Sequence, residues 1–333
     1  MNKKSNHKSH VLVIGGAGYI GTHMVRLLLE NDFSPIVFDN LSTGNRRFVP
    51  KGVPFVKGDL RIQRDIDKVF EKYAIDSVIH FSAASLVYES VTDPIKYYDN
   101  NVISFVRLLA SMRRNKIRKI IFSSTAATFG EPKRIPIREN DVQDPTNPYG
   151  QSKLMMEKII MDSAKAYRDI DFTILRYFNV AGAWGDNKLG EVHNPETHIV
   201  PNILKSLLSK SEKLKIYGND YQTRDGTCLR DYVHVVDLCE AHLLALKKMN
   251  AGVKNEVFNL GTDKGTTLLE LIKSVEKVTG KKVEYEMCNR RPGDPARLVA
   301  SNKKAKDVLG WSPRYNLNDI IESAWKWEVS LQK

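Results

Sequence analysis

Short apolar runs alternate with longer amphipathic segments along the first half of the chain. The runs lie within residues 11–14, 35–38, 53–60, 77–84, 119–122 and 172–175. Amphipathic segments separate several of them, one running through Glu30 and others over residues 100–112 and 148–167. Near-continuous apolar strands that alternate with helices are typical of a parallel sheet with both faces covered. The pattern predicts an α/β fold built on a doubly wound parallel sheet.

The alternation weakens beyond about residue 180, where the chain becomes more mixed. A polar segment at residues 181–198 predicts a long functional loop. Helices are expected at 199–210, 236–249 and 267–279, strands at 257–260 and 283–287, and two helical pieces after them. We therefore expect a disordered basic leader (1–10), a first domain (11–180) and a smaller mixed α/β domain (181–333). Residues 233–262 of the last part are expected to pack back on the first domain.

A glycine-rich turn joins the first apolar run to the first amphipathic segment. Gly15, Gly18 and Gly21 follow a Gly-x-x-Gly-x-x-Gly spacing. The first permits a tight turn, the second lets the backbone approach a pyrophosphate, and the third lets the helix pack on the strand. The N-terminus of the helix would offer its N–H groups and positive dipole end to the phosphates. This context predicts a Rossmann-type dinucleotide-binding domain.

The residue that ends the second apolar run indicates which dinucleotide binds. Asp39 follows Gly21 by 18 residues. An acidic residue at this distance binds the ribose hydroxyls of the adenosine and repels a 2′-phosphate. We expect NAD rather than NADP as the cofactor.

Polar side chains follow other strands at the same edge of the predicted sheet. Asp59, Ser82 and the hydroxyl-bearing residues 123–125 all fall where ligands bind in such sheets. Tyr149 and Lys153 lie four residues apart at the start of a predicted helix, and hence on one face of it. A Tyr hydroxyl is a poor base at neutral pH, but a neighbouring cation favours its phenolate. Together with the glycine turn, this pair indicates a dehydrogenase-type site.

Composition and charge exclude several other classes of function. The 333 residues carry a net charge of +12, but the basic residues are scattered and no nucleic-acid motif accompanies them. We interpret the charge as a solvated surface and expect no nucleic-acid partner. No run approaches the roughly 18 apolar residues of a membrane span, so no membrane association is expected. The first ten residues lack the apolar region of a signal peptide.

The cysteines indicate a reducing compartment. Cys228, Cys239 and Cys288 are widely spaced and odd in number, which favours free thiols over a disulfide framework. No two of them are close enough in sequence to suggest a structural zinc site. We expect a cytoplasmic protein without a bound metal.

Eight segments resemble the UDP-glucose 4-epimerase family, a branch of the extended short-chain dehydrogenases/reductases. They are GGAGYIG (15–21), DNLSTG (39–44), YYDNNV (97–102), FSSTAATFG (122–130), NPYGQSK (147–153), RYFNVAGA (176–183), YGNDYQTRDGTCLRDYVHV (217–235) and RRPGDPARLVAS (290–301). The resemblance covers nearly all of the chain past residue 10. It implies an isomerase that interconverts UDP-glucose and UDP-galactose through a 4-keto sugar, with NAD held throughout the cycle. Such an enzyme serves galactose metabolism and supplies sugar nucleotides for glycans.

The resemblance also implies roles for individual residues. Tyr149 would be the base, Lys153 its pKa partner and Thr125 a hydrogen-bond partner of the sugar. The implied NAD-binding residues, with the glycines of the turn, are Tyr19, Ile20, Asp39, Asn40, Leu41, Ser42, Thr43, Gly44, Asp59, Leu60, Phe81, Ser82, Ala83, Ala84, Ser85, Asn100, Thr125, Tyr149, Lys153 and Phe178. The implied UDP-sugar residues, besides Thr125 and Tyr149, are Asn179, His198, Ile199, Tyr217, Arg230, Arg291 and Asp294.

Related activities remain as alternatives. In the same resemblance, 4,6-dehydratases carry Asp-Glu after the active-site Thr and decarboxylases carry a Glu there, whereas this chain has Ala126 and Ala127. Elimination would lack its proton-transfer groups without a carboxylate. A non-catalytic NAD-binding regulator would not need Thr125, Tyr149 and Lys153 together. Leu298 aligns close to a position that governs access of N-acetyl sugars, so a UDP-N-acetylglucosamine 4-epimerase stays open.

Two further expectations come from the resemblance. Helices near residues 100–113 and 149–166 correspond to those that form a dimer interface in the family, so a homodimer is expected. Ser85, Tyr88 and Phe129 depart from the family pattern, which usually has Lys, Gly and Tyr at these positions. None of these departures removes a chemical role.

Overall fold

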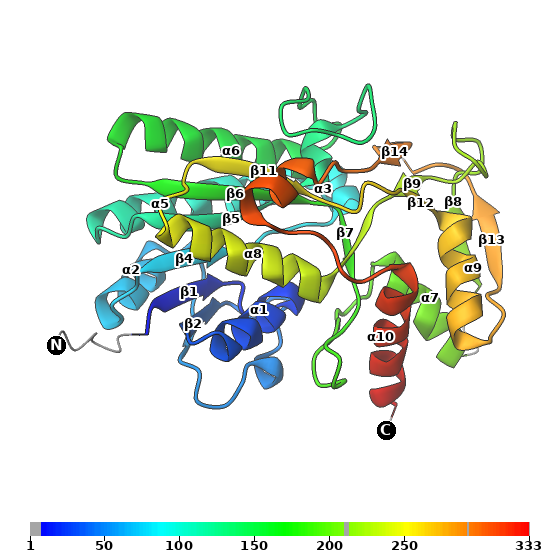
Figure 1. Ribbon diagram of the computed structural model, residues 1–333, viewed down its shortest axis with the longest axis horizontal. Helices are drawn as coiled ribbons and strands as arrows, with labels where there is room; N and C mark the ends of the chain where they lie inside the picture. The colour runs from blue at the N-terminus through cyan, green and yellow to red at the C-terminus, as the bar shows by residue number, and fades with distance from the viewer. Residues whose placement is uncertain (1–7, 210–212, 292, 333) are drawn as a thin grey trace.

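The structure is a computed structural model of the chain (Figure 1). It describes residues 8–209, 213–291 and 293–332. Most of the predicted basic leader (residues 1–7) and the last residue of the helix predicted at 199–210 lie outside the described residues.

A seven-stranded, all-parallel sheet forms the centre of the molecule, and it confirms the predicted fold class. Its order is β11-β6-β5-β4-β1-β2-β3, so the strand order reverses between β1 and β4. Ligands bind beyond the strand ends at such a reversal. The bounds are β1 His10–Ile14, β2 Ser34–Asp39, β3 Phe55–Lys57, β4 Ser77–His80, β5 Lys119–Thr125, β6 Asp171–Tyr177 and β11 Glu256–Leu260.

Helices cover both faces of this sheet, which explains why its strands are apolar on both sides. Val11 and Val13 contribute to one core with α1 and α8, whereas Leu12 and Ile14 contribute to the other with α2, α5 and α6. Successive side chains of a strand point to opposite faces, so both faces need apolar residues. The helices are α1 Tyr19–Glu30, α2 Gln63–Lys72, α3 Val87–Thr92, α4 Pro94–Tyr97, α5 Ser104–Arg114, α6 Pro148–Tyr167 and α8 Val235–Asn250.

A smaller group of elements lies at one end of the sheet, on the right of Figure 1. Helices α7 Ile199–Leu208, α9 Leu268–Thr279 and α10 Leu317–Ser330 share a separate core with strand β8 Leu214–Tyr217. Strand β13 Tyr285–Cys288 pairs with β8 in parallel. The remaining strands are β7 Asn179–Ala181 and β10 Tyr232–His234, which pair in parallel, and β9 Leu229–Arg230, β12 Thr266–Thr267 and β14 Arg297–Leu298, which form a small sheet.

The chain returns from this smaller group to the central sheet. Strand β11 pairs with β6 in parallel, and α8 packs beside α1. The division into domains at residue 180 stays a prediction. Within the described parts of the chain, none of the helices combines the length and apolar content that a membrane crossing requires.

Several predicted elements differ from the observed ones near the strand ends. The strand expected at residues 77–84 ends at His80, where its neighbour β1 also ends at Ile14, and the backbone of Ala84 is bonded by the side chain of Asn101 instead. Strand β5 instead continues through Thr125, pairing with β6 over its whole length. The helix expected at residues 100–112 begins with a π-helical turn, η2 (Tyr98–Ile103), before α5. These changes all lie at the edge of the sheet that carries the candidate site.

Candidate functional site

The glycine turn has the close backbone approach that its spacing predicts. Gly15 has φ +76°, and a Cβ there would lie 2.8 Å from the backbone nitrogen of Ser82. A Cβ on Gly21 would lie 2.1 Å from the carbonyl oxygen of Gly15. Gly18 caps α1 without a side-chain hydrogen bond, which leaves the N–H groups of the first turn directed at the space beyond β1. Tyr19 and Ile20 form this first turn.

Asp39 lies at the end of β2 and organises the loop that follows. Its Oδ2 accepts from Ala17 N at 2.9 Å and its Oδ1 from Leu41 N at 2.8 Å, while burial raises its pKa. A Cβ on Gly44 would lie 2.8 Å from this carboxylate, so the loop can close over it only with glycine there. Each carboxylate oxygen keeps a lone pair for a ribose hydroxyl. Ser42 and Thr43 are exposed between these points.

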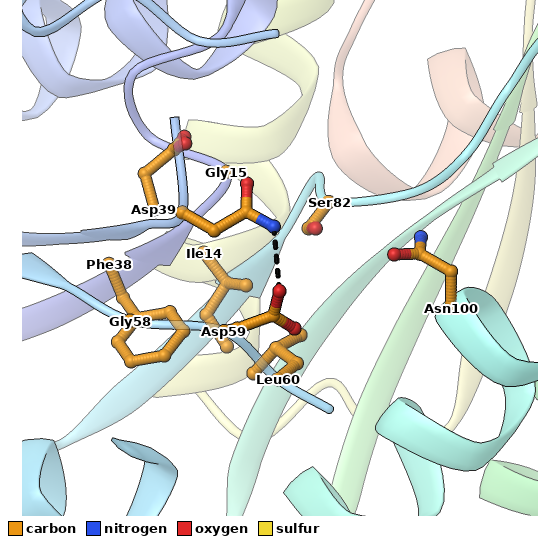
Figure 2. A pocket seen from close by; sticks show the side chains of 10 residues that line it. Ile14, Gly15, Phe38, Asp39, Gly58, Asp59, Leu60, Ser82 and Asn100 are labelled. Atoms are coloured by element: carbon orange, nitrogen blue, oxygen red, sulfur yellow. Dashed lines mark hydrogen bonds between the residues drawn. The ribbon is translucent and has the colours of Figure 1, made fainter. Parts of the chain in front are cut away.

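A pocket opens beyond the ends of β1, β2, β3 and β4 (Figure 2). Its lining consists of Ile14, Gly15, Phe38, Asp39, Asn40, Gly58, Asp59, Leu60, Ser82 and Asn100. Asn40 Nδ2 donates to Asp59 Oδ2 at 3.0 Å. Arg61 donates to the same carboxylate from its NH2 at 2.8 Å and from its Nε at 3.1 Å. These contacts, first of all those of Arg61, hold the pKa of Asp59 well below its usual range. Seven of the residues predicted to bind NAD meet here: Gly15, Asp39, Asn40, Asp59, Leu60, Ser82 and Asn100.

The side chain of Asn101, which was not among the predicted site residues, holds the backbone of residues 81–85 by hydrogen bonds at the edge of the sheet. Asn101, which is 1% exposed, accepts from Ala84 N at 2.9 Å and donates to Ala84 O and to Ser152 Oγ, both at 3.0 Å. The ring centroids of Phe81 and His242 lie 4.8 Å apart. Ala83 is half-buried. Asn101 adjoins Asn100 in the YYDNNV segment, so the motif itself carried the signal.

Thr125, Tyr149 and Lys153 come together from β5 and α6. Asn147 caps α6 by accepting from Gly150 N at 2.9 Å, and Pro148 occupies its first turn. These start signals place Tyr149 in the first turn of α6 and Lys153 one turn later. Burial raises the pKa of the half-buried Tyr149, and a hydrogen bond with the Thr125 side chain lowers it.

Lys153 follows Tyr149 by one turn of α6 and lies against strand β5. Its Nζ donates to the carbonyl oxygen of Ser123 at 2.9 Å and lies 4.9 Å from the Phe122 ring centroid. Burial lowers the pKa of Lys153 to about 7, while the charge of Glu157 raises it. The hydroxyl of Ser123 is 2.9 Å from His242 Nε2. The ammonium therefore sits in an apolar surrounding with a carbonyl partner, where its proton is held less tightly than in water.

A buried ion pair supports the strand and helix that carry these three residues. Arg176 NH2 and Nε lie 2.6 and 3.0 Å from the carboxylate of Glu157, and Ser124 Oγ donates to the same group at 2.5 Å. Gln143 Nε2 adds a bond of 3.1 Å. Glu157 follows Lys153 by one helical turn, so the pair connects β5, β6 and α6. This network was not predictable from the sequence, because a charged residue on a helix usually indicates an exposed face.

Four of the residues predicted to bind a UDP-sugar form two contacting pairs. The others, Asn179 and the adjacent His198 and Ile199, belong to neither pair. Arg230, 8% exposed, donates to Asp294 Oδ1 at 2.6 Å, and the Arg291 guanidinium lies 3.7 Å from the Tyr217 ring centroid. Asn179 starts β7, where its N–H donates to the Asp231 carbonyl.

His198 and Ile199 stand apart from these pairs, at the start of α7. The contacts of the His198 ring within the described residues are with Glu191, Glu196 and His193. The predicted contact of His198 with a UDP-sugar stays a prediction.

The three residues that depart from the family pattern lie in different surroundings. Ser85 is exposed, and Tyr88 is 67% exposed on α3. Phe129, 1% exposed, packs in a small cluster with Ala126 and Leu298, with Phe178 at its edge. The ring of Phe129 is thus fully covered beside the turn that follows Thr125. Leu298 lies close to the same turn, which is the structural reason that its size could affect the sugar.

The observed chemistry fits a dinucleotide. The Gly15 and Gly21 cradle admits backbone-close phosphates that a side chain would exclude, and the Asp39 carboxylate lies beyond the adjacent strand. The Tyr149, Thr125 and Lys153 group lies two strands away on the other side of β1, on β5 and α6. Phosphate binding, ribose recognition and proton transfer therefore share one edge of the sheet.

Comparisons with known proteins give one consistent result. The NAD dependent epimerase/dehydratase family model matches residues 11–261. The UDP-glucose 4-epimerase of Lacticaseibacillus casei is 51% identical over 318 residues, which are 95% of this chain and 96% of that protein.

Solved structures agree with this similarity. The UDP-glucose 4-epimerase from Brucella ovis in complex with NAD matches with a TM-score of 0.91 at 45% identity, over 95% of this chain and 97% of that chain. The enzyme from Bifidobacterium longum in complex with NAD+ and UDP matches with a TM-score of 0.93 at 38% identity, over 97% and 98%.

Proposed function

The chain belongs to the NAD-dependent epimerase/dehydratase family, and from this membership and the site we propose that it interconverts UDP-glucose and UDP-galactose by inverting C4 of the sugar. The observation that carries the proposal is the group of Tyr149, Thr125 and Lys153 at the same edge of the sheet as the glycine turn. A proton acceptor next to a dinucleotide cradle suits the removal of a hydroxyl proton together with a carbon-bound hydrogen.

The residues of the cradle would hold NAD. Gly15, Gly18 and Gly21 would receive the pyrophosphate, and Asp39 the adenosine ribose, whose free hydroxyls it selects over a 2′-phosphate. When bound, NAD supplies the group that takes the hydrogen from C4 and returns it to the opposite face. Asn101 would keep residues 81–85 in place beneath it, because its side chain fixes both backbone groups of Ala84.

Tyr149 would take and return the proton of the 4-hydroxyl. Burial raises the pKa of Tyr149, so the phenolate needs support from nearby donors and cations. Thr125 supplies a hydrogen bond, and Lys153 on the same helix is the cation for that role. With the sugar bound, Tyr149 would accept the proton of the 4-hydroxyl, and Thr125 would hydrogen-bond to the same hydroxyl.

The nucleotide half of the substrate would bind at the smaller group of elements. Arg230 and Arg291 suit a diphosphate because a guanidinium matches phosphate oxygens in a fork geometry. The buried pair of Arg230 with Asp294 holds the first of these in place. Anchoring through the nucleotide would leave the keto sugar free to present its other face, which inversion requires.

Elimination is disfavoured at this site. Ala126 and Ala127 occupy the turn after Thr125, where a lyase needs a carboxylate. The buried carboxylate of Glu157 on α6 already forms an ion pair with Arg176 and accepts hydrogen bonds from Ser124 and Gln143. The proposed chemistry thus stops at reversible oxidation of C4, in preference to a decarboxylase or dehydratase.

Incubation of the purified protein with UDP-galactose tests the activity. We expect UDP-glucose to form without added NAD if the cofactor copurifies, and NAD to be released on denaturation. Conversion of UDP-galactose with a higher kcat/KM than UDP-N-acetylgalactosamine would support the proposed substrate. A preference for the N-acetyl sugar would assign the alternative, a UDP-N-acetylglucosamine 4-epimerase, and absence of any product with NAD bound would reject the enzyme.

A second copy of this chain is the proposed partner. Exposed apolar side chains gather on the helices between residues 87 and 114: Tyr88 (67% exposed), Ile95 (73%), Ile103 (45%) and Val106 (46%). Isolated exposed apolar residues are ordinary, but a group on neighbouring helices marks an interface. Ile103 and Val106 lie in the first of the two segments, near residues 100–113 and 149–166, that the family resemblance assigns to a dimer interface, and Tyr88 and Ile95 extend the surface beyond it.

Charging this surface should break the dimer. We expect light scattering at micromolar concentration to give the dimer mass for the wild type and the monomer mass for Ile103→Glu/Val106→Glu. Leu29→Glu on α1, where the side chain is 42% exposed outside this surface, is the matched control and should remain dimeric. A wild-type monomer would contradict the prediction.

We also place the protein in the cytoplasm. Cys228, Cys239 and Cys288 are free in the structure, which fits a reducing compartment. Sugar nucleotides and NAD are available there to a protein of this activity.

A further inference from the structure

Two histidines and two glutamates converge in the loop that precedes α7. Glu191, His193, Glu196 and His198 each direct one ligand-type atom to a space where all four atoms lie within 4.8 Å of one another. His193 Nδ1 is 3.2 Å from Glu191 Oε1 and 3.8 Å from Glu196 Oε1. His198 Nδ1 is 2.6 and 3.5 Å from the same two oxygens. The four atoms belong to a stretch of eight residues, so the loop itself encloses the space.

These separations match those of a four-coordinate metal site. Zinc binds imidazole nitrogen and carboxylate oxygen at about 2.0–2.2 Å. The edges of a tetrahedron with such bonds are about 3.4 Å long, and the four measured separations are distributed around that value. Two imidazoles and two carboxylates are a nitrogen and oxygen ligand set, which suits zinc better than calcium or magnesium.

Two polar atoms in and beside the cluster lack a hydrogen-bond partner within the described residues. The Nδ1 atom of His193 is buried and, within the described residues, makes no hydrogen bond of acceptable geometry. Glu328 on α10, 2% exposed, has a carboxylate oxygen without a hydrogen-bond partner in the described part of the chain, and it interacts electrostatically with Glu191 and Glu196. Glu191 and Glu196 lie beside imidazoles that carry a charge only when protonated, and Lys205 lies beside Glu196. A bound cation would balance these carboxylates with both imidazoles neutral.

The surroundings orient two of the ligands. Lys205 Nζ lies 3.3 Å from Glu196 Oε2, the oxygen that does not face the histidines. Trp327 Nε1 donates to the carbonyl oxygen of Glu191 at 3.0 Å. Partners in a second layer of this kind hold metal ligands in position. They come from α7 and α10, so the site would connect this loop to the smaller group of elements.

We propose that Glu191, His193, Glu196 and His198 form a structural zinc site that fixes the loop at residues 182–198. Four protein ligands leave no open position, which is typical of structural rather than catalytic zinc. The site differs from two expectations of the sequence analysis, namely that no metal binds and that His198 contacts the UDP-sugar. The sequence analysis judged zinc from the cysteine spacing alone, whereas these ligands are histidines and glutamates. The proposal does not depend on the enzymatic activity.

Metal content and zinc-dependent stability of the full-length protein, prepared without a histidine tag, test the site. We expect elemental analysis to find zinc in a one-to-one ratio to the chain after growth with added zinc. Removal with a chelator should lower the melting temperature, and ZnCl2 should restore it. Co²⁺ in place of zinc should give the visible absorption of a tetrahedral site.

Three variants give the comparison. His193→Gln removes a half-buried ligand and His198→Gln an exposed one, so at least the second should fold normally by circular dichroism. Each should weaken zinc binding by calorimetry at least about 10-fold, the smallest loss that changes around metal sites cause. Glu71→Gln on the exposed face of α2 is the control and should bind zinc as the wild type does. Absence of stoichiometric zinc together with no response to ZnCl2, or equal binding by wild type and both histidine variants, would overturn the proposal.

Discussion

Replacing Tyr149 with Phe should lower kcat for UDP-galactose by about 10²- to 10⁴-fold, the usual contribution of a positioned base. The substitution removes the hydroxyl that bonds to the Thr125 side chain and keeps the ring, which lies 6.4 Å from the Tyr97 ring in an edge-on arrangement. The fold and the cofactor cradle should therefore persist. Because the lost interaction develops during reaction, KM should change far less than kcat.

Steady-state kinetics, NAD released on denaturation and UDP affinity by calorimetry separate the possible outcomes. Tyr73→Phe is the matched control: Tyr73 lies at the end of α2, away from the site, and is partly buried there. This control should have wild-type kcat. A Tyr149→Phe enzyme with full NAD content and a kcat within about 10-fold of wild type would show that another group takes the proton.

The central fold was predictable because its signal is local. Runs such as residues 11–14 are apolar on both faces, and only a covered parallel sheet needs that. The glycine turn and the Asn147-Pro148 start of α6 are likewise read from neighbouring residues. The end of β4 at His80 was not predictable in this way, because it depends on the neighbouring strand β1, which ends opposite it at Ile14, and the backbone beyond it at Ala84 is bonded by Asn101.

The candidate site was likewise predictable where its signal is local and not predictable where it depends on tertiary contacts. Asp39, Tyr149 and Lys153 have recognisable spacings, and the structure places them at one edge of the sheet. The environment of Lys153 could not be predicted from the Tyr-x-x-x-Lys spacing: the strand carbonyl of Ser123 and the ring of Phe122 surround its ammonium, and burial lowers its pKa to about 7. The pairing of Arg230 with Asp294 also depends on tertiary contact, since 64 residues separate them.

The ion pair of Glu157 and Arg176 should be the most sensitive point for stability near the site. Their side chains are 1% and 3% exposed, and the pair connects α6 to β6. Replacing Arg176 with Met keeps most of the volume but leaves the carboxylate without its cation. Breaking a buried pair from one side costs about 3–5 kcal/mol, so we expect the free energy of unfolding to fall by about that amount.

The double variant Glu157→Gln/Arg176→Met distinguishes an unpaired charge from lost packing. Removing both charges should recover much of the loss, because replacing a buried pair by neutral groups is often close to neutral, and Gln can still bond to Ser124. Urea unfolding followed by circular dichroism measures both variants, with Lys68→Met on the exposed part of α2 as the control. A single variant within about 1 kcal/mol of wild type, the ordinary effect of a substitution, would contradict the prediction. A double variant no more stable than Arg176→Met would instead assign the loss to packing of the arginine stem against Phe129, whose ring centroid lies 5.2 Å from the guanidinium.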